Sequence, residues 1–587
     1  MERTFVEKLL NAEKGSIVVR KPDFVMSHDN SARVRRIFER IEGTEVYDPS
    51  QLVIVLDGKV SGLTTEVAMD YGSIRDFVEE QGVKHFYDSE RGICHQLMAD
   101  LVRPGMFIIG SDTHTATAGA FNAFAFGVNK TTTAVAWKTG RVWCRVPETI
   151  KIVLKNRLAT GVVAKDLALW LMGVLKGMNV SGQFVEYHGE GVATLSIADR
   201  MTIANISWEM GLMGAVFPPD DVLADYFGEL AVRGVWADNG ATYSRYIEID
   251  LAQVYPLVYD AYKERVLGVN ELAGLEIQQG LVGACASGRL EDLRLVAQVL
   301  DGEQVAKGFQ LFVVPASRDI YLEALEEGII DKITRAGAVI LASSCGPCMG
   351  IGHVASAGNS RLVSTANSHF TGSLTGNGIE KYIASPLTVA MTALRGELST
   401  VVNFEGAHYK QREKIVEHSR LEEYDYRKSN GIWNYSDIDN ISVNQIFAEK
   451  LTYKISSEQT DRIKPYLFEG LDENFAQDVR NGDIIVAGEN FGCGRLVKHA
   501  VTGLVAAGVK VIIAKSVDWG FFRMAMNHGL RIVVAWDVAK AYTSRDHLKV
   551  DFQQGALWLN DTRYALPPED VEFTEMMEKG GILKAFS

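Results

Sequence analysis

The sequence predicts an α/β protein built from several parallel β-sheets that are covered by helices. Between about residues 50 and 350, short β-branched apolar runs alternate with longer amphipathic stretches. The length of 587 residues corresponds to roughly three to five domains. The composition, with 47% hydrophobic and 23% charged residues, is typical of a globular protein and excludes disordered, collagen-like and low-complexity classes.

The apolar runs are predicted to be buried strands, because each is short and ends in glycine or small polar residues. They lie at 51–58, 105–112, 149–156, 310–317 and 338–344, with helices predicted at 64–82 and 317–329. Such alternation predicts parallel sheets whose functional loops gather at the C-terminal ends of the strands.

A polar, highly charged stretch at about 405–445 is predicted to connect two regions of the chain. A second α/β unit follows this connection. Its strands are predicted at 482–490, 509–516 and 530–536.

The charge balance favours an enzyme that acts on a small molecule. The chain has 60 basic and 74 acidic residues, a net charge of −14, which argues against nucleic acid as a main partner. The N-terminus has no signal or transit pattern, and no apolar run approaches the length of a membrane helix. We therefore expect a cytoplasmic protein without a membrane partner.

The six cysteines do not form a disulfide framework in such a chain, and Cys94 and Cys144 are expected to be buried free thiols. Cys285 follows a strand-like run, while Cys345 and Cys348 form a C-x-x-C in a Gly-Pro turn. Three thiolates are too few for a closed zinc site. They suit a [4Fe–4S] cluster with one open iron, which would act as a Lewis acid. A thioredoxin-like redox pair is the competing interpretation.

Seven long motifs follow one another along nearly the whole chain. They are GICHQ at 92–96, SDTHT at 111–115, VPETIK at 146–151, DRMTIANISWEMGLMGAVFPPD at 199–220, GACASGR at 283–289, SSCGPCMG at 343–350 and GDIIVAGENFGCG at 482–494. In this order they resemble the aconitase superfamily, and the sequence is most similar to an isopropylmalate dehydratase with its large and small subunits fused.

The resemblance implies an aconitase-like fold, with three α/β domains around an iron–sulfur cluster and a C-terminal swivelling domain. We expect the cluster-binding region at 1–405, a linker at 406–445 and the small-subunit-like domain at 446–587. The cluster ligands of the family fall on Cys285, Cys345 and Cys348.

The resemblance also implies an acid–base set that handles the iron-bound hydroxyl and water. Its members fall on His95, Asp112, His114 and Glu209, and Asn205 matches a further motif position that we assign to substrate binding. The chemistry is reasonable, because a hydroxyl leaves more easily when iron polarises it and a nearby acid donates a proton.

Other family positions are changed in this chain. Serines 368 and 373 stand where relatives have two carboxylate-binding arginines, Arg495 replaces the catalytic serine, and Val497 replaces another arginine. A family histidine that follows Asp57 is Gly58 here. Because bidentate arginine contacts with carboxylates are strong, citrate, isopropylmalate and homocitrate are not expected to be good substrates.

The favoured hypothesis is a hydro-lyase, a hydratase, dehydratase or isomerase, with a diverged small-molecule substrate. Its substrate would contact Ser368, His369, Ser373, Arg495 and Lys498; Arg495 or Lys498 would replace a lost cation, and His369 or His499 the lost base. Two alternatives stay open: cluster-assisted hydrolysis or transformation of a nitrogen- or sulfur-containing metabolite, and a non-catalytic iron–sulfur regulator. A monomer or homodimer is expected.

Overall fold

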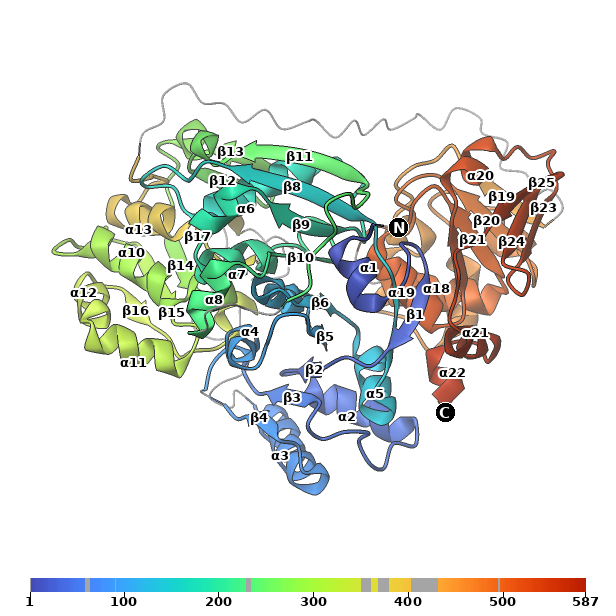
Figure 1. Cartoon of the computed structure of the whole chain (residues 1–587), viewed down its shortest axis with the longest axis horizontal. Coiled ribbons are helices and arrows are strands. Elements are labelled where there is room, and N and C mark those ends of the chain that lie inside the picture. The colour runs from blue at the N-terminus through green and yellow to red at the C-terminus, as the bar shows by residue number, and fades with distance from the viewer. Residues whose placement is uncertain are drawn as a thin grey trace.

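The computed structural model describes residues 2–58, 64–89, 91–228, 234–349, 360–367, 379–402, 431–494 and 497–586. The fold is α/β, as predicted, with separate sheets packed side by side and the C-terminal region, coloured orange to red, on the right of Figure 1.

The first region contains a five-stranded parallel sheet in the order β4-β3-β2-β5-β6. The strands are β2 (Phe24–Ser27), β3 (Leu52–Val55), β4 (His85–Tyr87), β5 (Phe107–Gly110) and β6 (Phe124–Gly127), and the helices of this region include α2 (Ser31–Arg40), α3 (Thr65–Gln81) and α5 (Lys130–Thr139). The Thr64 hydroxyl accepts a hydrogen bond from Val67 N at the start of α3, and Gly82 ends the helix in the left-handed conformation.

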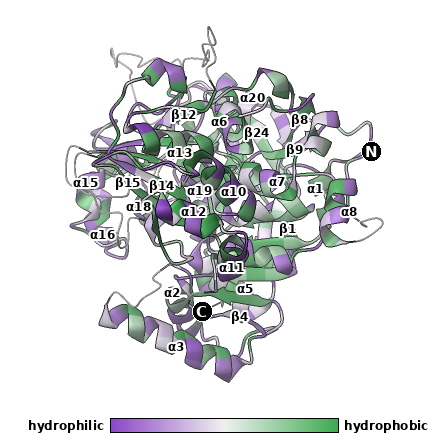
Figure 2. Ribbon diagram, turned by 90° about the vertical axis from the view of Figure 1, so that its left-hand side faces the viewer, coloured by the Kyte–Doolittle hydropathy of each residue, from purple (hydrophilic) through white to green (hydrophobic). Residues whose placement is uncertain are grey.

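Figure 2 shows hydrophilic and hydrophobic residues mixed along α3, at the lower edge of the molecule. The buried residues of this helix recur every three or four positions, as expected for an amphipathic helix; they are Val67, Tyr71, Ile74 and Phe77. The helix predicted at 64–82 is therefore confirmed.

Two further sheets build the middle of the chain. The four-stranded parallel sheet contains β8 (Thr149–Lys155), β9 (Phe184–His188), β10 (Gly214–Val216) and β11 (Arg245–Asp250), with helices α6 (Ala164–Leu175) and α7 (Ile197–Asn205). The seven-stranded mixed sheet contains β12 (Leu257–Asp260), β13 (Arg265–Gly268), β14 (Gln279–Gly283), β15 (Gln310–Val314), β16 (Val339–Ile340), β17 (Arg361–Ser364) and β18 (Glu380–Ala384), with helices α10 (Leu290–Leu300), α11 (Arg318–Glu326), α12 (Ile329–Arg335) and α13 (Pro386–Arg395).

The C-terminal region has a four-stranded parallel sheet and a small antiparallel one. The parallel sheet contains β19 (Ile432–Tyr435), β20 (Ile484–Ala487), β21 (Val511–Ala514) and β22 (Arg531–Val534), with helices α18 (Val497–Ala507) and α19 (Trp519–Asn527). The antiparallel sheet contains β23 (Leu548–Asp551), β24 (Ala556–Leu559) and β25 (Thr562–Ala565).

Every strand predicted by its residue range is present, and so is the helix predicted at 317–329, as α11. The strand predicted to be buried at 338–344 is not buried, because β16 has only two residues and lies at the edge of its sheet. The strand β19 lies within the range predicted as a linker at 406–445, yet it pairs with β20 and so belongs to the C-terminal sheet. Residues 403–430 lie outside the described part of the chain. The domain boundaries at 405 and 446 stay predictions.

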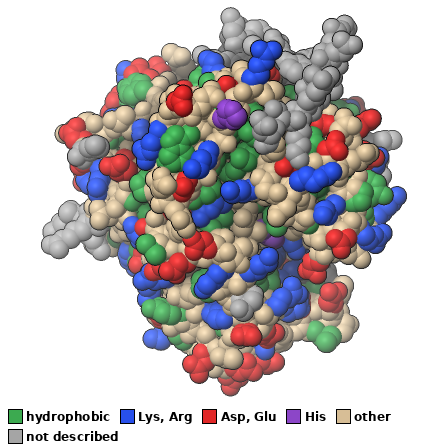
Figure 3. Space-filling model, turned by 90° about the vertical axis from the view of Figure 1, so that its right-hand side faces the viewer, with side chains coloured by type: hydrophobic (Ala, Val, Ile, Leu, Met, Phe, Trp, Pro, Cys, Tyr) green, Lys and Arg blue, Asp and Glu red, His purple; other side chains and the backbone are tan. Residues whose placement is uncertain are grey.

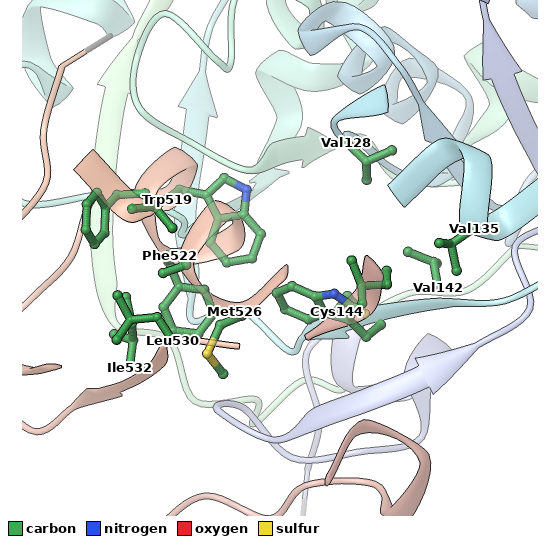
Figure 4. Close-up of a cluster of buried hydrophobic side chains, with 14 of the residues drawn as sticks. Val128, Val135, Val142, Cys144, Trp519, Phe522, Met526, Leu530 and Ile532 are labelled. Carbon is green, nitrogen blue, oxygen red and sulfur yellow. The ribbon is translucent and has the colours of Figure 1, made fainter. Parts of the chain in front are cut away.

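The C-terminal region packs against the first region through a shared apolar cluster. Figure 4 shows Trp519, Phe522 and Met526 of α19 close to Cys144, on the strand β7 (Val142–Arg145). Asn527 joins the two regions with hydrogen bonds, because its Oδ1 accepts from Trp143 Nε1 at 2.9 Å and its Nδ2 donates to Thr132 Oγ1 at 3.0 Å.

The surface carries charged side chains of both signs, as expected from the numbers of acidic and basic residues in the sequence. On the face shown in Figure 3, basic and acidic side chains both occur across the surface. Among the described helices, none combines the length and the apolar character that crossing a membrane requires.

Candidate functional site

The predicted site residues follow strands of different sheets, at the C-terminal ends where functional loops were expected. Asp112 follows β5, Cys285 follows β14 and Cys345 follows β16; Asp57, which was not predicted as a site residue, follows β3. Asp57 connects these loops, because its backbone oxygen accepts from Cys345 N and its carboxylate accepts from Cys94 N, each at 2.8 Å. The site is therefore assembled from segments that are distant in sequence.

The three cysteines predicted as ligands are reduced, and Cys285 and Cys348 are buried. Cys285 and Cys348 belong to an apolar cluster whose other members are Ile93, Leu281, Ala284, Phe312, Val314, Leu362 and Ala366. Gly283, directly before the short helix of Cys285, has a φ of 123°, and a Cβ there would collide with the carbonyl of Val314. Glycine at this position therefore lets the cysteine loop turn closely against β15.

The donor set fits an iron–sulfur cluster. Burial raises the pKa of Cys285 and raises that of Cys345 far above its usual value, with the charges of Asp57, Cys348 and Cys285 adding to the effect on Cys345. Thiols in such surroundings stay protonated unless a bound metal stabilises the thiolates. The raised pKa of Cys345 argues against a thioredoxin-like pair with Cys348, because the reactive cysteine of such a pair needs a lowered pKa.

The predicted acid–base residues form one connected group. His95 Nε2 lies 2.8 Å from Asp112 Oδ1, which also accepts from His114 N at 2.8 Å, and His114 Nε2 lies 3.0 Å from Glu209 Oε1. The second oxygen of Glu209 is buried and has no hydrogen-bond partner within the described chain. The structure thus brings together the four residues that the sequence selected, and leaves one acceptor unused.

Charge coupling within this group determines its protonation. Burial raises the pKa of Asp112, but His95 and His114 lower it more, so it lies well below its usual value. Burial lowers the pKa of His114, but the charge of Glu209 and the hydrogen bond with Asp112 raise it more, well above its usual value. The arrangement therefore contains a carboxylate that stays ionised and a histidine that retains its proton.

The sequence analysis missed His28, a buried histidine directly after β2. Its Nδ1 lies 3.4 Å from Asp57 Oδ1, and its Nε2 lies 3.6 Å from Asp112 Oδ2. Strand β2 pairs in parallel with both β3 and β5, which places the end of β2 between the two aspartates. A signal existed in the polar Ser-His-Asp that ends this strand, but the sheet order was needed to interpret it.

We expect His28 to stabilise the apoprotein in a pH-dependent way. Burial lowers its pKa, but the hydrogen bond and charge of Asp57, with Asp112, raise it to about 9. A raised pKa adds stability that is complete below the unfolded value near 6.5 and is lost as the pH rises through about 9. The difference between the folded and unfolded pKa values of His28 corresponds to about 3 kcal/mol in the free energy of unfolding. Urea unfolding of wild type and His28→Gln should therefore differ most at pH 6 and converge above pH 9.

The control for this prediction is His547→Gln, because His547 is exposed. That variant should follow wild type at every pH. A stability difference between wild type and His28→Gln that stays constant from pH 6 to pH 9.5 would contradict the charged pair of His28 and Asp57.

Comparison with known proteins identifies the family. The model of the aconitase family (aconitate hydratase) matches residues 7–261 and 260–396, and that of the aconitase C-terminal domain matches residues 403–531. The chain belongs to the aconitase family. Both family regions lie in one chain here.

Two curated relatives and one solved structure illustrate the similarity. The 3-isopropylmalate dehydratase large subunit 1 of Methanopyrus kandleri is 39% identical over 415 residues, 68% of this chain and 99% of that protein. The mitochondrial homoaconitase of Debaryomyces hansenii is 29% identical over 558 residues, 88% of this chain and 81% of that protein. A crystal structure of 3-isopropylmalate dehydratase from Methanocaldococcus jannaschii is 28% identical and covers 25% of this chain and 86% of that chain, with a TM-score of 0.22.

Within this aconitase-family site, Asn205 is fully buried and lies beside Cys285, whose Sγ donates to Asn205 Oδ1 at 3.9 Å. Asn367 Nδ2 donates to the same oxygen at 2.6 Å, and Lys165 Nζ donates to Asn367 Oδ1. This buried chain of polar groups orients the side chain of Asn205. Its contact with substrate stays a prediction.

Most of the predicted substrate-binding residues cannot be placed, because Ser368, His369, Ser373 and Arg495 lie outside the described residues. Lys498 is exposed and lines a cavity of about 390 Å³ together with Asp112. His499 was suggested as a replacement base, but its Nε2 lies 2.9 Å from the carbonyl oxygen of Ile455 and its ring stacks on Phe447. These contacts make the ring of His499 part of the packing of the C-terminal region and give no support to that suggestion.

Proposed function

We propose that this aconitase-family protein is an iron–sulfur-dependent hydro-lyase for a small hydroxy or unsaturated acid other than citrate or isopropylmalate. The single observation that carries the proposal is the connected group of His95, Asp112, His114 and Glu209. Burying four ionisable groups is costly even when they are paired, which favours their use in catalysis over a regulator without activity.

Cys285, Cys345 and Cys348 would hold the cluster, which supplies a Lewis acid that polarises a bound hydroxyl. The protein residues manage the proton. His114 retains a proton between Glu209 and Asp112 and can donate it to a departing hydroxyl. Asp112 stays ionised and orients both His95 and His114, so the group can release and recover one proton in each turnover.

We include His28 and Asp57 in this proposal. Together they would replace the family histidine, whose position is occupied by Gly58 in this chain. The pair comes from two neighbouring strands instead of two neighbouring residues, and it reaches Asp112 through His28 Nε2 at 3.6 Å. A second proton donor thus lies on the side of Asp112 opposite to the oxygen that contacts His95 and His114.

Substitution of this histidine tests its role. His28→Gln is expected to lower kcat by about 10²- to 10⁴-fold, as for loss of a general acid, with little change in KM. The control is His499→Gln, which should keep kcat near that of wild type because His499 packs within the C-terminal region. A kcat of His28→Gln equal to that of wild type would remove His28 from the mechanism.

The lining of the cavity supports a diverged substrate. Val497, at a position where relatives have a carboxylate-binding arginine, lines the same cavity as Asp112. An apolar side chain there supports a substrate with a different set of carboxylates from those of citrate or isopropylmalate. We further propose that the protein is cytoplasmic and that it is a monomer or a homodimer.

Oxygen exchange tests the proposed reaction. Protein reconstituted anaerobically is incubated in heavy-oxygen water with a panel of C4 to C7 hydroxy acids and their unsaturated partners, which include citrate and isopropylmalate. We expect oxygen exchange and interconversion for at least one pair, and little for citrate or isopropylmalate. If the reconstituted protein catalyses oxygen exchange with none of the acids, the hydro-lyase proposal is overturned. Rapid turnover of isopropylmalate would overturn the proposal of a diverged substrate.

A further inference from the structure

A cavity of about 390 Å³ lies between the first region and the C-terminal region, next to the acid–base group. One wall comes from the loops that follow β5 and β6 and includes Asp112 and Val128. The opposite wall comes from the starts of α18 and α19 and includes Val497 and Lys498. A molecule in this cavity would reach the proton-handling residues with one end and the C-terminal region with the other.

Helix α19 presents one face to this cavity, through Gly520, Arg523 and Met524 at helical spacings of three and four residues. Arg523 is 5% exposed, and all three of its guanidinium nitrogens are buried without a hydrogen-bond partner in the described chain. Arg523 also forms no ion pair with any described residue. Such a guanidinium leaves five N–H donors unused, which is costly inside a protein.

Aromatic rings offset part of this cost. The guanidinium carbon lies 4.5 Å from the ring centre of Trp143, 5.4 Å from that of Phe126 and 5.6 Å from that of Trp519. Cation–π contacts hold the charge but satisfy no hydrogen bond. Burial lowers the pKa of Arg523 only to about 10, so the group is a cation at neutral pH.

A second cation lies on the same wall. Lys498, in the first turn of α18, is exposed and forms no ion pair within the described chain. Asp112 is the one described carboxylate that lines the cavity. Its Oδ1 is engaged by His95 and His114, and its Oδ2 lies 3.6 Å from His28 Nε2. The cavity therefore combines two positive charges that have no ionic partner among the described residues with apolar surface from Val128, Trp208, Val497 and Met524.

We propose that Arg523 and Lys498 form a carboxylate-binding subsite, which holds the non-reacting end of the substrate. This inference rests on the proposed function and narrows it: the substrate carries one carboxylate attached to a short branched apolar chain. The carboxylate would supply the acceptors that the Arg523 guanidinium lacks, and the chain would contact the apolar walls. The subsite restores, from different positions, the positive charge that Ser368, Ser373 and Val497 have lost.

Direct binding tests the subsite without turnover. The probes are isovalerate and isovaleramide, which share one shape but differ in charge, titrated into reconstituted protein by calorimetry. We expect isovalerate to bind at least about ten times more tightly than the amide. Lys498→Met and Arg523→Met should each weaken isovalerate binding by about 10- to 100-fold and leave amide binding unchanged, as for loss of a charge-assisted contact.

Two further variants sharpen the test. Lys510→Met removes an exposed lysine outside this cavity and should bind both probes like wild type. Arg523→Lys keeps the charge without the fork of donors and should fall between wild type and Arg523→Met. If Arg523→Met does not fold, Lys498→Met alone decides, because Lys498 is exposed and its replacement disturbs no packing.

The outcomes separate the two proposals. Equal binding of the two probes, no binding of isovalerate, or unchanged affinity in both methionine variants would overturn the subsite. If the protein binds isovalerate more tightly than the amide but catalyses oxygen exchange with none of the acids, the subsite proposal holds and the hydro-lyase proposal is overturned.

Discussion

The Cys345→Ser variant is expected to lose the intact cluster and, with it, more than about a thousandfold in activity, since a Lewis acid contributes several kcal/mol to such a step. Cys345 lies in the loop whose backbone is bonded to Asp57, and its thiol interacts electrostatically with Cys348 and Cys285. Serine keeps the volume but replaces the soft sulfur ligand with a hard oxygen, which iron–sulfur clusters rarely accept. Iron and sulfide content after anaerobic reconstitution, with the visible spectrum, measures the loss.

The matched control is Cys144→Ser, because Cys144 is a buried free thiol in the apolar cluster between the two regions, apart from the three cysteines. That variant should bind the cluster like wild type, even if it is less stable. A full cluster with four irons in Cys345→Ser would show that the assignment of three cysteine ligands is wrong.

The second large effect is expected for Asp112→Asn, which should lower kcat by about 10²- to 10⁴-fold. Asparagine preserves the shape and one acceptor oxygen, so the contacts of His95 and the backbone of His114 can persist. The negative charge is lost, however, and that charge helps to keep His114 and His28 protonated. We expect the loss in kcat with nearly unchanged KM and cluster content.

Asp472→Asn provides the comparison, because Asp472 is another buried carboxylate that accepts a hydrogen bond from Tyr435 at 2.9 Å, far along the chain in the C-terminal region. Its activity should match wild type. If Asp112→Asn retains wild-type kcat, the ionised carboxylate is not required and the proton-handling role of the group fails.

Local pattern was sufficient to predict much of the fold. Strands such as β3 and β21 are short β-branched runs, and α3 has buried residues at helical spacing with clear caps. The strand β19 was missed, because its four residues stand within a strongly charged stretch and only pairing with β20 gives them a place in a sheet. Neighbouring strands determine such elements more than their own composition does.

The site residues that lie in sequence motifs could be predicted, whereas those placed by packing between distant segments could not. The four acid–base residues lie in recognisable motifs, and the structure places them within hydrogen-bonding distance of one another. His28 depends on the order of three strands, and Arg523 depends on contacts with Trp143 and Phe126 in another region of the chain. Side chains brought together by non-local pairing leave no signal in local spacing.

The apolar contact between α19 and β7 has a consequence for how the protein assembles. Two separate chains would each expose Trp519 or Trp143 to water before they met, and their encounter would depend on their concentrations in the cell. Within one chain the encounter is intramolecular, at an effective concentration of roughly millimolar or more. The joined chain therefore keeps the cavity beside Asp112 assembled at any dilution.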